Sequence, residues 1–390
     1  MPAKILPKRP LRASLLAGVL VALLPAVSSA QFLEAEMDQT VDGLGRMTVE
    51  EYWTRDRIRS ARPAPMGVTT FREPGVHRLR DDRRQSRSVE SFDPSEEPEI
   101  NPRVRRELEQ RGSRDDAGDD PVSRMVSSTS YPFTSRRVTP RSAVTSGPYR
   151  RVGKLFFDIP GAGPHVCSAS VISRRLIITA AHCVYDRDTN SFYRNVVFIP
   201  AFDGTLRNSD PYCTWTGEWA IVTWAWANSS GYPAPDDFAL LEMRDRWCNG
   251  GRHRIGDYLG WFGWSTFSLH GNHIAQLGYP GNLDNGQRMQ ITHSATYRRN
   301  HFAAEIGSAH WQGTSGGPWV QNLGLRPAGQ QAIGPAGRRG WNQIVGVSSY
   351  VAGPRLSDHN AHQIGGATIL NNRFVHIWNR ACSRHRFNCP

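Results

Sequence analysis

The sequence predicts an all-β protein over residues 138–390, built as a barrel or a sandwich. Short runs rich in β-branched and aromatic residues recur there between Gly, Pro, Asn and Asp, which is the pattern of short strands and turns. Helical periodicity is confined to short stretches, and all six cysteines of the chain lie in this region. The clearest runs are residues 152–159, 168–180, 219–226, 237–243, 274–279 and 344–351.

Two short helices complete the predicted domain. One follows the segment TAAHC, residues 179–183. The other covers residues 371–382, where Phe374, Ile377 and Trp378 recur at helical spacing. We expect this second helix to be the last element of the domain.

The first 30 residues have the composition of an export signal. Basic residues precede an apolar stretch at 14–27, and small residues follow it up to Ala30. The alternative, a membrane anchor, is disfavoured because the stretch is short for a hydrocarbon layer of about 30 Å. We expect cleavage after Ala30 and a secreted or periplasmic protein that is not held in a membrane afterwards.

The net charge of +12 leaves several classes of partner open. The sequence lacks zinc-finger spacing, basic-zipper heptads and the aromatic signature of RNA-binding modules, so we expect no nucleic-acid partner. In an exported chain, six cysteines indicate disulfides rather than a metal site, although six cysteines allow 15 pairings. We expect no metal and no cofactor, and the sequence leaves the oligomeric state open.

Residues 31–137, called the N-terminal segment below, differ from the rest of the chain. They are polar, repeatedly interrupted by charge as in residues 78–100, and free of cysteine. Such a composition buries too little apolar surface to offset chain entropy, so we expect the segment to be largely flexible, with one short helix at 103–112. It is either a linker or a prosegment that assists folding or delays activity. Basic residues that could mark processing are Arg136–Arg137 before Val138, and Arg141 before Ser142.

Three short motifs carry chemistry. They are TAAHC with His182, PDDFALLEM with Asp237, and GTSGGP with Ser315. A serine hydroxyl is a weak nucleophile that needs a base within hydrogen-bond reach, and a carboxylate can hold that base in the required tautomer. Taken alone, each motif could also have a purely structural role; GTSGGP, for example, could be an ordinary glycine-rich turn. Together and in this order they indicate a nucleophilic serine hydrolase.

The motifs resemble those of the chymotrypsin-like or trypsin-like serine proteases, whose chain order is also His, Asp, Ser. The resemblance covers residues 138–390. It implies two antiparallel six-stranded β-barrels with a short C-terminal helix and a cleft between the barrels. His182 and Asp237 would then belong to the first barrel and Ser315 to the second.

The same resemblance implies the roles of these residues. His182 is the expected base, Asp237 its partner and Ser315 the nucleophile, while the backbone amides of Gly313 and Ser315 would form the oxyanion hole. It also implies a disulfide between Cys167 and Cys183. Cys382 and Cys389 are close enough in sequence to close a small loop, which leaves Cys213 and Cys248 as the third pair.

Within the family, the chain is most similar to the bacterial glutamyl-endopeptidase-like branch. Residues 144–157 resemble the start of that branch's barrel, and residues 277–289 resemble its Gly-Tyr-Pro-Gly segment. The branch tolerates a non-acidic residue before the serine, here Thr314, so the chain does not carry the trypsin-like aspartate that pairs with a new N-terminus. We therefore expect activation by another route.

The expected substrate-binding residues lie in two stretches, residues 309–310 and 348–351. Trypsin-like enzymes place an aspartate where this chain has Ala309, so a preference for Lys or Arg is not expected. His310 either recognises an acidic side chain or is a plain structural residue, and Ser348 stands where the branch usually has a histidine. The backbone of Ser349, Tyr350 and Val351 would pair with the substrate by β-augmentation.

The sequence thus predicts a secreted serine endopeptidase that is made as a precursor and cleaves polypeptides through an acyl-enzyme. The alternative is a non-catalytic protease homologue that acts as a secreted binding module. In a third interpretation, the basic N-terminal segment binds acidic polymers or surfaces. Alternating Trp224 and Trp226 favour barrel packing over carbohydrate binding.

Overall fold

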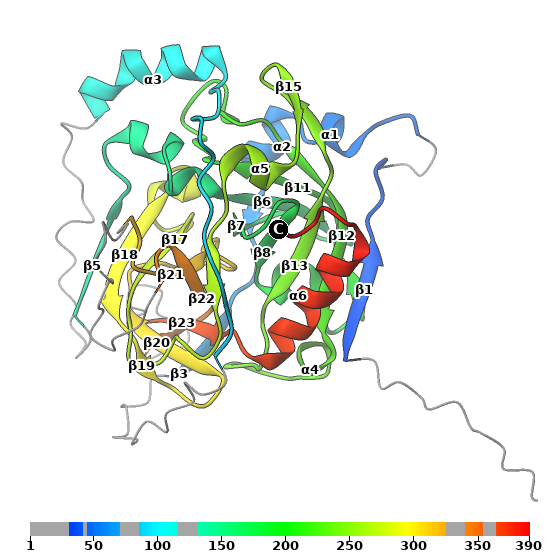
Figure 1. Cartoon of the computed structure of the whole chain (residues 1–390), viewed down its shortest axis with the longest axis vertical. Coiled ribbons are helices and arrows are strands. Elements are labelled where there is room, and N and C mark those ends of the chain that lie inside the picture. Colours follow the sequence, from blue (N-terminus) through cyan, green and yellow to red (C-terminus); the bar gives the residue numbers. More distant parts are fainter. Residues whose placement is uncertain (1–30, 42–44, 71–85, 116–131, 325–339, 354–363) are drawn as a thin grey trace, which may run out of the picture. The chain divides into compact units, whose positions relative to one another are not determined.

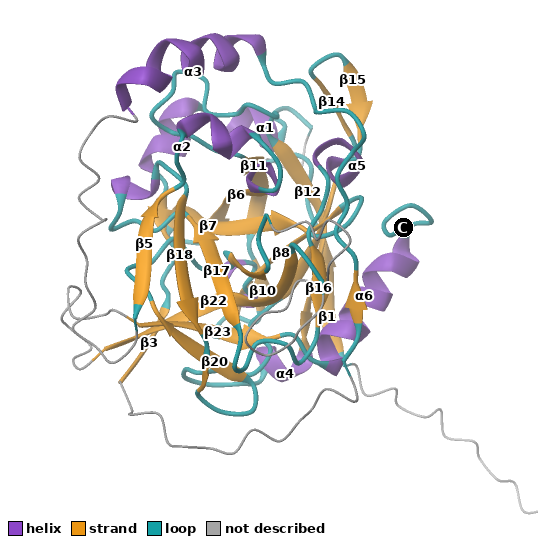
Figure 2. Ribbon diagram, turned by 60° about the vertical axis from the view of Figure 1, so that its left-hand side comes forward, coloured by secondary structure: helices purple, strands orange, loops and turns teal. Residues whose placement is uncertain are grey.

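Strands dominate the described part of the structure, and helices are few (Figure 2). The computed structural model describes residues 31–41, 45–70, 86–115, 132–324, 340–353 and 364–390, and the expected export signal lies outside them. No helix in these ranges is long and apolar enough to cross a membrane.

The first barrel is a closed ring of six antiparallel strands (Figure 1). Their order is β12-β11-β6-β7-β8-β13, and the pairing of β12 with β13 closes the ring. The strands are β6 (Val152–Ile159), β7 (Gly163–Val171), β8 (Leu176–Thr179), β11 (Arg194–Pro200), β12 (Trp215–Thr223) and β13 (Ala239–Met243).

The second sheet also has six antiparallel strands, in the order β20-β23-β22-β21-β17-β18. Within the described ranges, no β-pairing joins β18 to β20. Two short strands flank the sheet, and they are β16 (Gly263–Ser265) and β19 (Tyr297–Arg298). The six strands of the sheet itself are β17 (His273–Gly278), β18 (Gln290–Ala295), β20 (Ala303–Gly307), β21 (Pro318–Gln321), β22 (Gln343–Gly353) and β23 (Ile364–Ile369). The predicted all-β class is confirmed.

Each sheet encloses apolar side chains that are fully buried. Phe156, Trp215 and Leu240 lie in the large cluster that includes the first barrel, and Ile306 and Trp319 lie in a second cluster inside the other sheet. Burying one such side chain contributes about 1.5–3 kcal/mol. Apolar residues that recur in the predicted strands therefore fill these two cores.

Short elements connect the strands. Of these, α6 begins after Asn371, whose side chain accepts hydrogen bonds from the backbone of Arg373 and Phe374, so the expected C-terminal helix is confirmed. The elements are β9 (Tyr185–Asp186), β10 (Ser191–Phe192), β14 (Arg246–Cys248), β15 (Gly251–His253), α4 (Trp224–Ala227), α5 (Ile255–Leu259), α6 (Asn372–Arg384), and the 3-10 turns η3 (Arg141–Thr145), η4 (Tyr149–Arg151), η5 (Ala181–Cys183) and η6 (Asp284–Gly286).

The expectation that both alternating tryptophans pack inside a barrel is wrong for Trp224. Strand β12 ends at Thr223, whose hydroxyl accepts a hydrogen bond from the backbone of Trp226 and starts α4. Trp226 is fully buried, whereas Trp224 is 53% exposed. Alternation in the sequence could not reveal that the chain leaves the strand at this point.

The described parts of the N-terminal segment are ordered and attached to the two sheets. Strand β1 pairs with β12, β4 with β16, and β5 with β18 over its whole length. The expectation of a largely flexible segment does not hold for these ranges, because the sheet edges supply hydrogen-bond partners that local composition cannot reveal. The elements are β1 (Phe32–Glu36), α1 (Val49–Tyr52), α2 (Arg55–Ser60), β2 (Arg62–Pro63), β3 (Gly67–Thr70), β4 (Ser88–Val89), α3 (Pro102–Asp115) and β5 (Phe133–Arg137).

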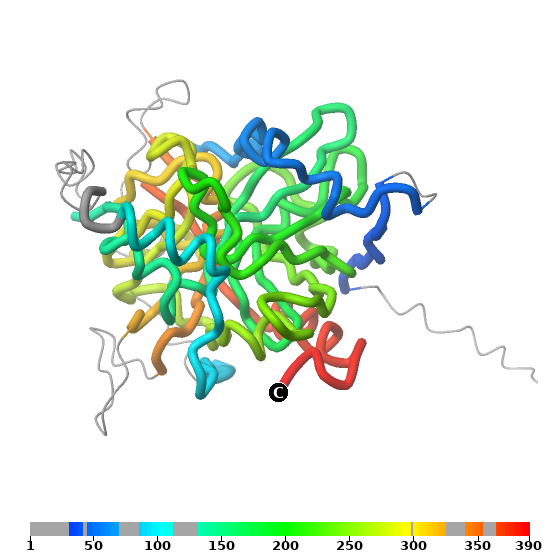
Figure 3. Tube along the Cα trace, turned by 90° about the horizontal axis from the view of Figure 1, so that it is seen from above, coloured from blue at the N-terminus to red at the C-terminus, as the bar shows by residue number. Residues whose placement is uncertain are grey.

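Helix α3 contains the short helix expected at residues 103–112. Strand β5 belongs to the second sheet, so that sheet begins N-terminal to the expected boundary at Val138. In Figure 3 the blue and cyan tube of the N-terminal segment lies against the green and yellow tube of the later residues.

Three disulfides are present in the structure. Among the described residues no cysteine is free. They join Cys167 to Cys183, Cys213 to Cys248, and Cys382 to Cys389.

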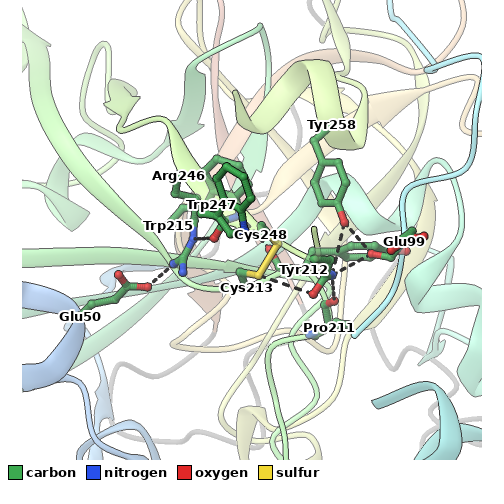
Figure 4. The surroundings of a disulfide bond; sticks show 11 residues. Glu50, Glu99, Pro211, Tyr212, Cys213, Trp215, Arg246, Trp247, Cys248 and Tyr258 are labelled. Carbon is green, nitrogen blue, oxygen red and sulfur yellow. Dashed lines mark hydrogen bonds and ion pairs between the residues drawn. A yellow bond between two sulfur atoms is a disulfide. The ribbon is translucent and has the colours of Figure 1, made fainter. Parts of the chain in front are cut away.

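Side-chain contacts also attach the N-terminal segment near the β14–β15 hairpin, whose disulfide is drawn in Figure 4. Arg246 on β14 forms an ion pair with Glu50 of α1. On the other side of the disulfide, the Tyr258 hydroxyl donates a 2.5 Å hydrogen bond to the backbone carbonyl of Glu99. Both Glu50 and Glu99 belong to the N-terminal segment, so it is held at two places around this hairpin.

Candidate active site

His182 and Asp237 form the centre of the site. The Nδ1 atom of His182 lies 2.8 Å from Oδ2 of Asp237, and the backbone N–H of His182 donates a 3.0 Å hydrogen bond to Oδ1 of the same carboxylate. The hydroxyl of Ser349 donates a 2.5 Å hydrogen bond to Oδ2. Asp237 is fully buried, so its charge is stabilised by three donors rather than by water.

Strand pairing explains why these two residues meet. His182 follows β8 and Asp237 precedes β13, and Thr179 pairs with Ala239 at the ends of these strands. The chain therefore brings the residues beyond each strand end to one place. The disulfide from Cys183 to β7 fixes the short turn that carries the histidine.

Ser315 lies in the loop between β20 and β21, and backbone hydrogen bonds hold this loop against both sheets. The carbonyl of Ser315 accepts a 2.8 Å hydrogen bond from the backbone of Ser168 on β7, and the N–H of Gly316 donates one of 2.8 Å to Ser348 on β22. Gly316 has φ +76°, and a Cβ there would overlap the Thr179 hydroxyl. A glycine is therefore required directly after the serine.

Among the described residues, no hydrogen bond joins the side chains of His182 and Ser315, although Gly316 after the serine packs closely against Thr179 and Ala180 before the histidine. Nε2 of His182 and Oγ of Ser315 are both buried, and neither has a hydrogen-bond partner among the described residues. Catalytic hydrogen bonds are often long or misaligned in the absence of substrate.

The loop before Ser315 presents backbone amides. Within the described residues, neither the Gly313 N–H nor the Ser315 N–H donates a hydrogen bond. The carbonyl of Gln312 accepts a 2.7 Å hydrogen bond from Gly281, so the Gly313 N–H of the same trans peptide points the opposite way. Gly313 itself has φ +95°, and a Cβ on it would come within 2.6 Å of the Tyr279 carbonyl. The two amides are thus available to a negatively charged oxygen.

The pocket residues inferred from the sequence lie in apolar surroundings. Ala309 packs with Leu283 and Phe133, the latter from the N-terminal segment. His310 is almost completely buried, and burial lowers the pKa of its imidazole to about 3. Its Nδ1 lies 3.3 Å from the hydroxyl of Thr314. His310 is therefore a neutral ring at ordinary pH.

Ser348 uses its hydroxyl inside the protein. It accepts hydrogen bonds of 2.9 Å from Trp319 and 3.0 Å from Gln276, and it is fully buried. Tyr350 likewise turns its hydroxyl to Glu305, and burial raises the pKa of that phenol well above its usual value. Both hydroxyl groups are therefore used in hydrogen bonds within the protein.

Several residues at the site were not identified from the sequence. The Tyr232 ring lies 6.2 Å from the His182 ring in an edge-on arrangement, and Trp226 lies 6.4 Å from it. Arg187 covers both aromatic rings. No motif marks these residues: Arg187 follows His182 by five positions, and Trp226 and Tyr232 precede Asp237.

With this geometry established, the family can be assigned. The family model described as trypsin matches residues 146–368, which is more than half of the chain. The chain belongs to the trypsin family. The motifs that indicated a serine protease are all inside the matched range.

Two curated proteins are similar in sequence to this trypsin-family chain. A glutamyl endopeptidase of Bacillus licheniformis is 27% identical over 221 residues, covering 55% of this chain and 61% of that protein. An extracellular metalloprotease of Bacillus subtilis is 24% identical over 181 residues, covering 43% of this chain and 53% of that protein. The chain therefore spans less than two thirds of the relatives it matches. The first relative confirms the resemblance to the glutamyl-endopeptidase-like branch.

Solved structures of proteases are also similar to this trypsin-family chain. A thermostable serine protease from an extremophilic microorganism has a TM-score of 0.49 at 21% identity, covering 60% of this chain and 98% of that one. The protease Anisep from Arthrobacter nicotinovorans has 0.47 at 21%, covering 60% and 96%. A Glu endopeptidase has 0.45 at 19%, covering 64% and 97%.

The name of the second relative raises the question of a metal in this trypsin-family site. Among the described residues, one group of possible metal ligands lies close together, namely Cys167, His182 and Cys183. Both sulfur atoms are joined in a disulfide, and Nδ1 of His182 is hydrogen-bonded to the carboxylate of Asp237. These residues therefore do not fit a metal centre.

Proposed function

We propose that this protein is a secreted serine endopeptidase that cleaves polypeptides with Ser315, His182 and Asp237. The observation that supports this most is the buried bond between His182 Nδ1 and Asp237 Oδ2, with Ser349 as a further donor to the carboxylate. This arrangement leaves Nε2 as the basic nitrogen of the ring, on the side opposite the carboxylate. Such an imidazole can take a proton from a serine hydroxyl.

The reaction proceeds in two steps. Oγ of Ser315 attacks the peptide carbonyl as its proton moves to Nε2 of His182, and the N–H groups of Gly313 and Ser315 stabilise the oxyanion. The carbon–nitrogen bond then breaks, the amine leaves with the proton from His182, and an acyl-enzyme forms. Water attacks the ester in the same way and releases the acid, while Asp237 stabilises the imidazolium in both steps.

The substrate orientation follows from these roles. The leaving amine must reach His182, so the C-terminal half of the substrate extends over the first barrel, along β7, which contacts Ser315 directly. The N-terminal half then pairs with β22 at Tyr350 and Val351. A basic side chain is not expected next to the cleaved bond, because Ala309 supplies no carboxylate. The name of the Bacillus licheniformis relative makes Glu the first substrate to test, although His310 offers only a neutral ring to a carboxylate.

We propose that the enzyme is made as a precursor and that maturation cuts the chain before Phe133. The two basic sites named from the sequence are poor candidates. Arg137 lies within β5 and donates a 2.6 Å hydrogen bond to Asp284, and Arg141 is buried in an ion pair with Asp203. A protease needs an exposed, extended segment, which neither position offers.

A fluorophosphonate probe tests the catalytic proposal, because it reacts only with an activated serine. The mature form recovered from the culture medium should be labelled, and Ser315→Ala should abolish the label. His182→Ala should slow labelling by several orders of magnitude. Absence of labelling in the mature form would favour the non-catalytic binding module instead. Peptide-mixture cleavage then identifies the residue next to the cut.

A further inference from the structure

The N-terminal segment crosses the candidate active site. Strand β2 pairs in parallel with β7, placing Pro63 opposite Val166, and the N–H of Ala64 donates a 2.9 Å hydrogen bond to the Val166 carbonyl. Four residues further on, β3 pairs in parallel with β22, from Gly67 opposite Tyr350 to Thr70 opposite Gly353. Residues 62–70, called the cleft strand below, therefore run from the first barrel to the second sheet.

The cleft strand contacts the residues around the proposed nucleophile. A Cβ added to Gly281 would lie 2.8 Å from the Pro63 ring, and one added to Gly313 would lie 3.7 Å from it. At the other end, Gly67 is so close to Tyr232 that a Cβ would overlap the ring. Since Gly313 is a proposed oxyanion-hole residue and Tyr232 borders His182, the strand touches both sides of the site.

Met66 fixes the middle of the cleft strand. Its side chain is buried and packs with Trp311 and Val351, the first from the loop before Ser315 and the second from β22. Ala64 is also buried and belongs to the main apolar cluster. The cleft strand thus buries apolar side chains in the region where a substrate would bind.

The reacting atoms are covered in this arrangement. Ser315 is fully buried and His182 is 7% exposed, and the solvent does not reach Oγ or Nε2. A serine protease must admit both a peptide and water to these atoms. With the cleft strand in place, the edge of β22 that would pair with a substrate is already paired.

The direction of the cleft strand is opposite to that of a substrate. Under the proposed function, the N-terminal half of a substrate lies on β22 and the C-terminal half along β7. The cleft strand begins on β7 and ends on β22, and both of its pairings are parallel. A reversed peptide bond does not point its carbonyl and nitrogen to the oxyanion amides and His182 in the way that cleavage requires.

We propose that residues 62–70 are a built-in inhibitor that occupies the active site in the reverse direction and is not cleaved there. The proposal rests on the proposed function, and it specifies how the precursor is held inactive. It also defines the ligand class of the cleft in this state, a short peptide with an apolar side chain between Trp311 and Val351.

The first experiment measures the labelling rate of Ser315 in the full-length precursor by a fluorophosphonate, with precursor and mature bands separated on a gel. Met66→Asp places a carboxylate in an apolar contact and should release the cleft strand. If the open state is a minor population of the precursor, labelling should become about tenfold to a thousandfold faster. Met47→Asp is the matched control, because Met47 lies in the same segment but is 45% exposed, and it should leave the rate unchanged.

The outcomes separate the two proposals. If the wild-type precursor is labelled as fast as Met66→Asp, the inhibitor proposal is overturned while the proposed function stands. The same holds if the mature form is labelled but neither Met66→Asp nor Gly67→Val speeds labelling of the precursor. If the mature form itself is not labelled, the proposed function fails and the inhibitor proposal fails with it.

A second experiment does not depend on the folding of a variant precursor. The synthetic peptide ARPAPMGVTT, residues 61–70, is added to the mature form during hydrolysis of a peptide substrate. It should inhibit competitively and stay intact, and the same peptide carrying Gly67→Val should inhibit at least about tenfold less because of the overlap with Tyr232. Cleavage of the peptide, or equal inhibition by both peptides, would overturn the proposal.

Discussion

Arg373 on the C-terminal helix is paired with Asp236, the residue directly before Asp237. Its guanidinium bonds to both oxygens of the Asp236 carboxylate, and the bond raises the pKa of Arg373. Asn371 donates a further 2.7 Å hydrogen bond to the same carboxylate. Asp236 is fully buried with φ +57°, so this network holds the backbone that presents Asp237 to His182.

Replacing Arg373 by Ala should therefore affect stability and catalysis together. A buried carboxylate that loses a partner costs about 1–3 kcal/mol, measured as the free energy of unfolding in urea. A small displacement of Asp237 should also lower kcat by about tenfold to 100-fold. Arg380→Ala is the control, since Arg380 lies on the same helix and pairs with Glu34 at the surface. Equal kcat values for the two variants would contradict a positioning role of Arg373.

Ser349 offers a more local test of the same carboxylate. Ser349→Ala removes the hydroxyl that donates to Asp237 Oδ2 and leaves the backbone of β22 in place. The loss of one such hydrogen bond, worth about 1 kcal/mol, should lower kcat of the mature enzyme about fivefold, with little change in KM. Ser383→Ala, on the exposed face of α6, should leave kcat unchanged. A changed KM with an unchanged kcat would show that Ser349 acts on substrate binding instead.

The disulfides should differ in their effect on activity. The Cys167–Cys183 bridge closes 16 residues next to His182, so its removal by a double Ser substitution should cost about 3 kcal/mol of stability and also lower kcat. The Cys382–Cys389 bridge closes seven residues at the chain end, and its removal should lower stability alone. Thermal unfolding and hydrolysis rates of the two double variants test this. If both variants keep full kcat, the bridge next to His182 does not support the catalytic geometry.

Because His310 is buried, we expect the free energy of unfolding to depend on pH. Burial lowers its pKa to about 3 from an ordinary value of 6.5, so between these values the unfolded chain binds a proton that the folded chain does not. Stability contributed by this residue is complete above pH 6.5 and falls as the pH drops. Relative to His310→Gln, the wild type should lose about 2 kcal/mol of unfolding free energy between pH 7 and pH 5. Parallel pH dependences of the two proteins in urea unfolding would show that the imidazole is not buried as described.

The sequence predicted the motif residues of the candidate site because these motifs depend on local requirements. The serine needs glycines at its turn, as Gly316 shows, and the resemblance to the family's motif indicated Asp237 as the acidic residue, which lies beside His182 in the structure. Contacts that depend on tertiary packing could not be predicted. Arg373 is distant in sequence from Asp236, and nothing local marks Tyr232 as a neighbour of His182.

The N-terminal segment illustrates the same limit for the fold. Its strands are short and lack a sustained apolar pattern, and Pro63 and Pro65 lie within or directly after β2, so local composition favours a flexible chain. They are ordered because β7, β12, β18 and β22 supply backbone partners, and because Met66 enters an apolar contact that the cleft provides. A partner of this kind is visible only once both sheets are assembled.

Thr314 stands where trypsin-like enzymes carry the aspartate that pairs with a new N-terminus. Here Thr314 is fully buried, its hydroxyl faces the neutral ring of His310, and Gly278 packs tightly against it. Thr314→Asp would bury a carboxylate in this place, so it should lower stability by about 1–3 kcal/mol and should not raise kcat of the mature form. Thr314→Val, which keeps the shape, should retain most of the activity. If Thr314→Asp instead raised activity or made it depend on one particular N-terminal residue, release of the cleft strand would not be the main step of activation.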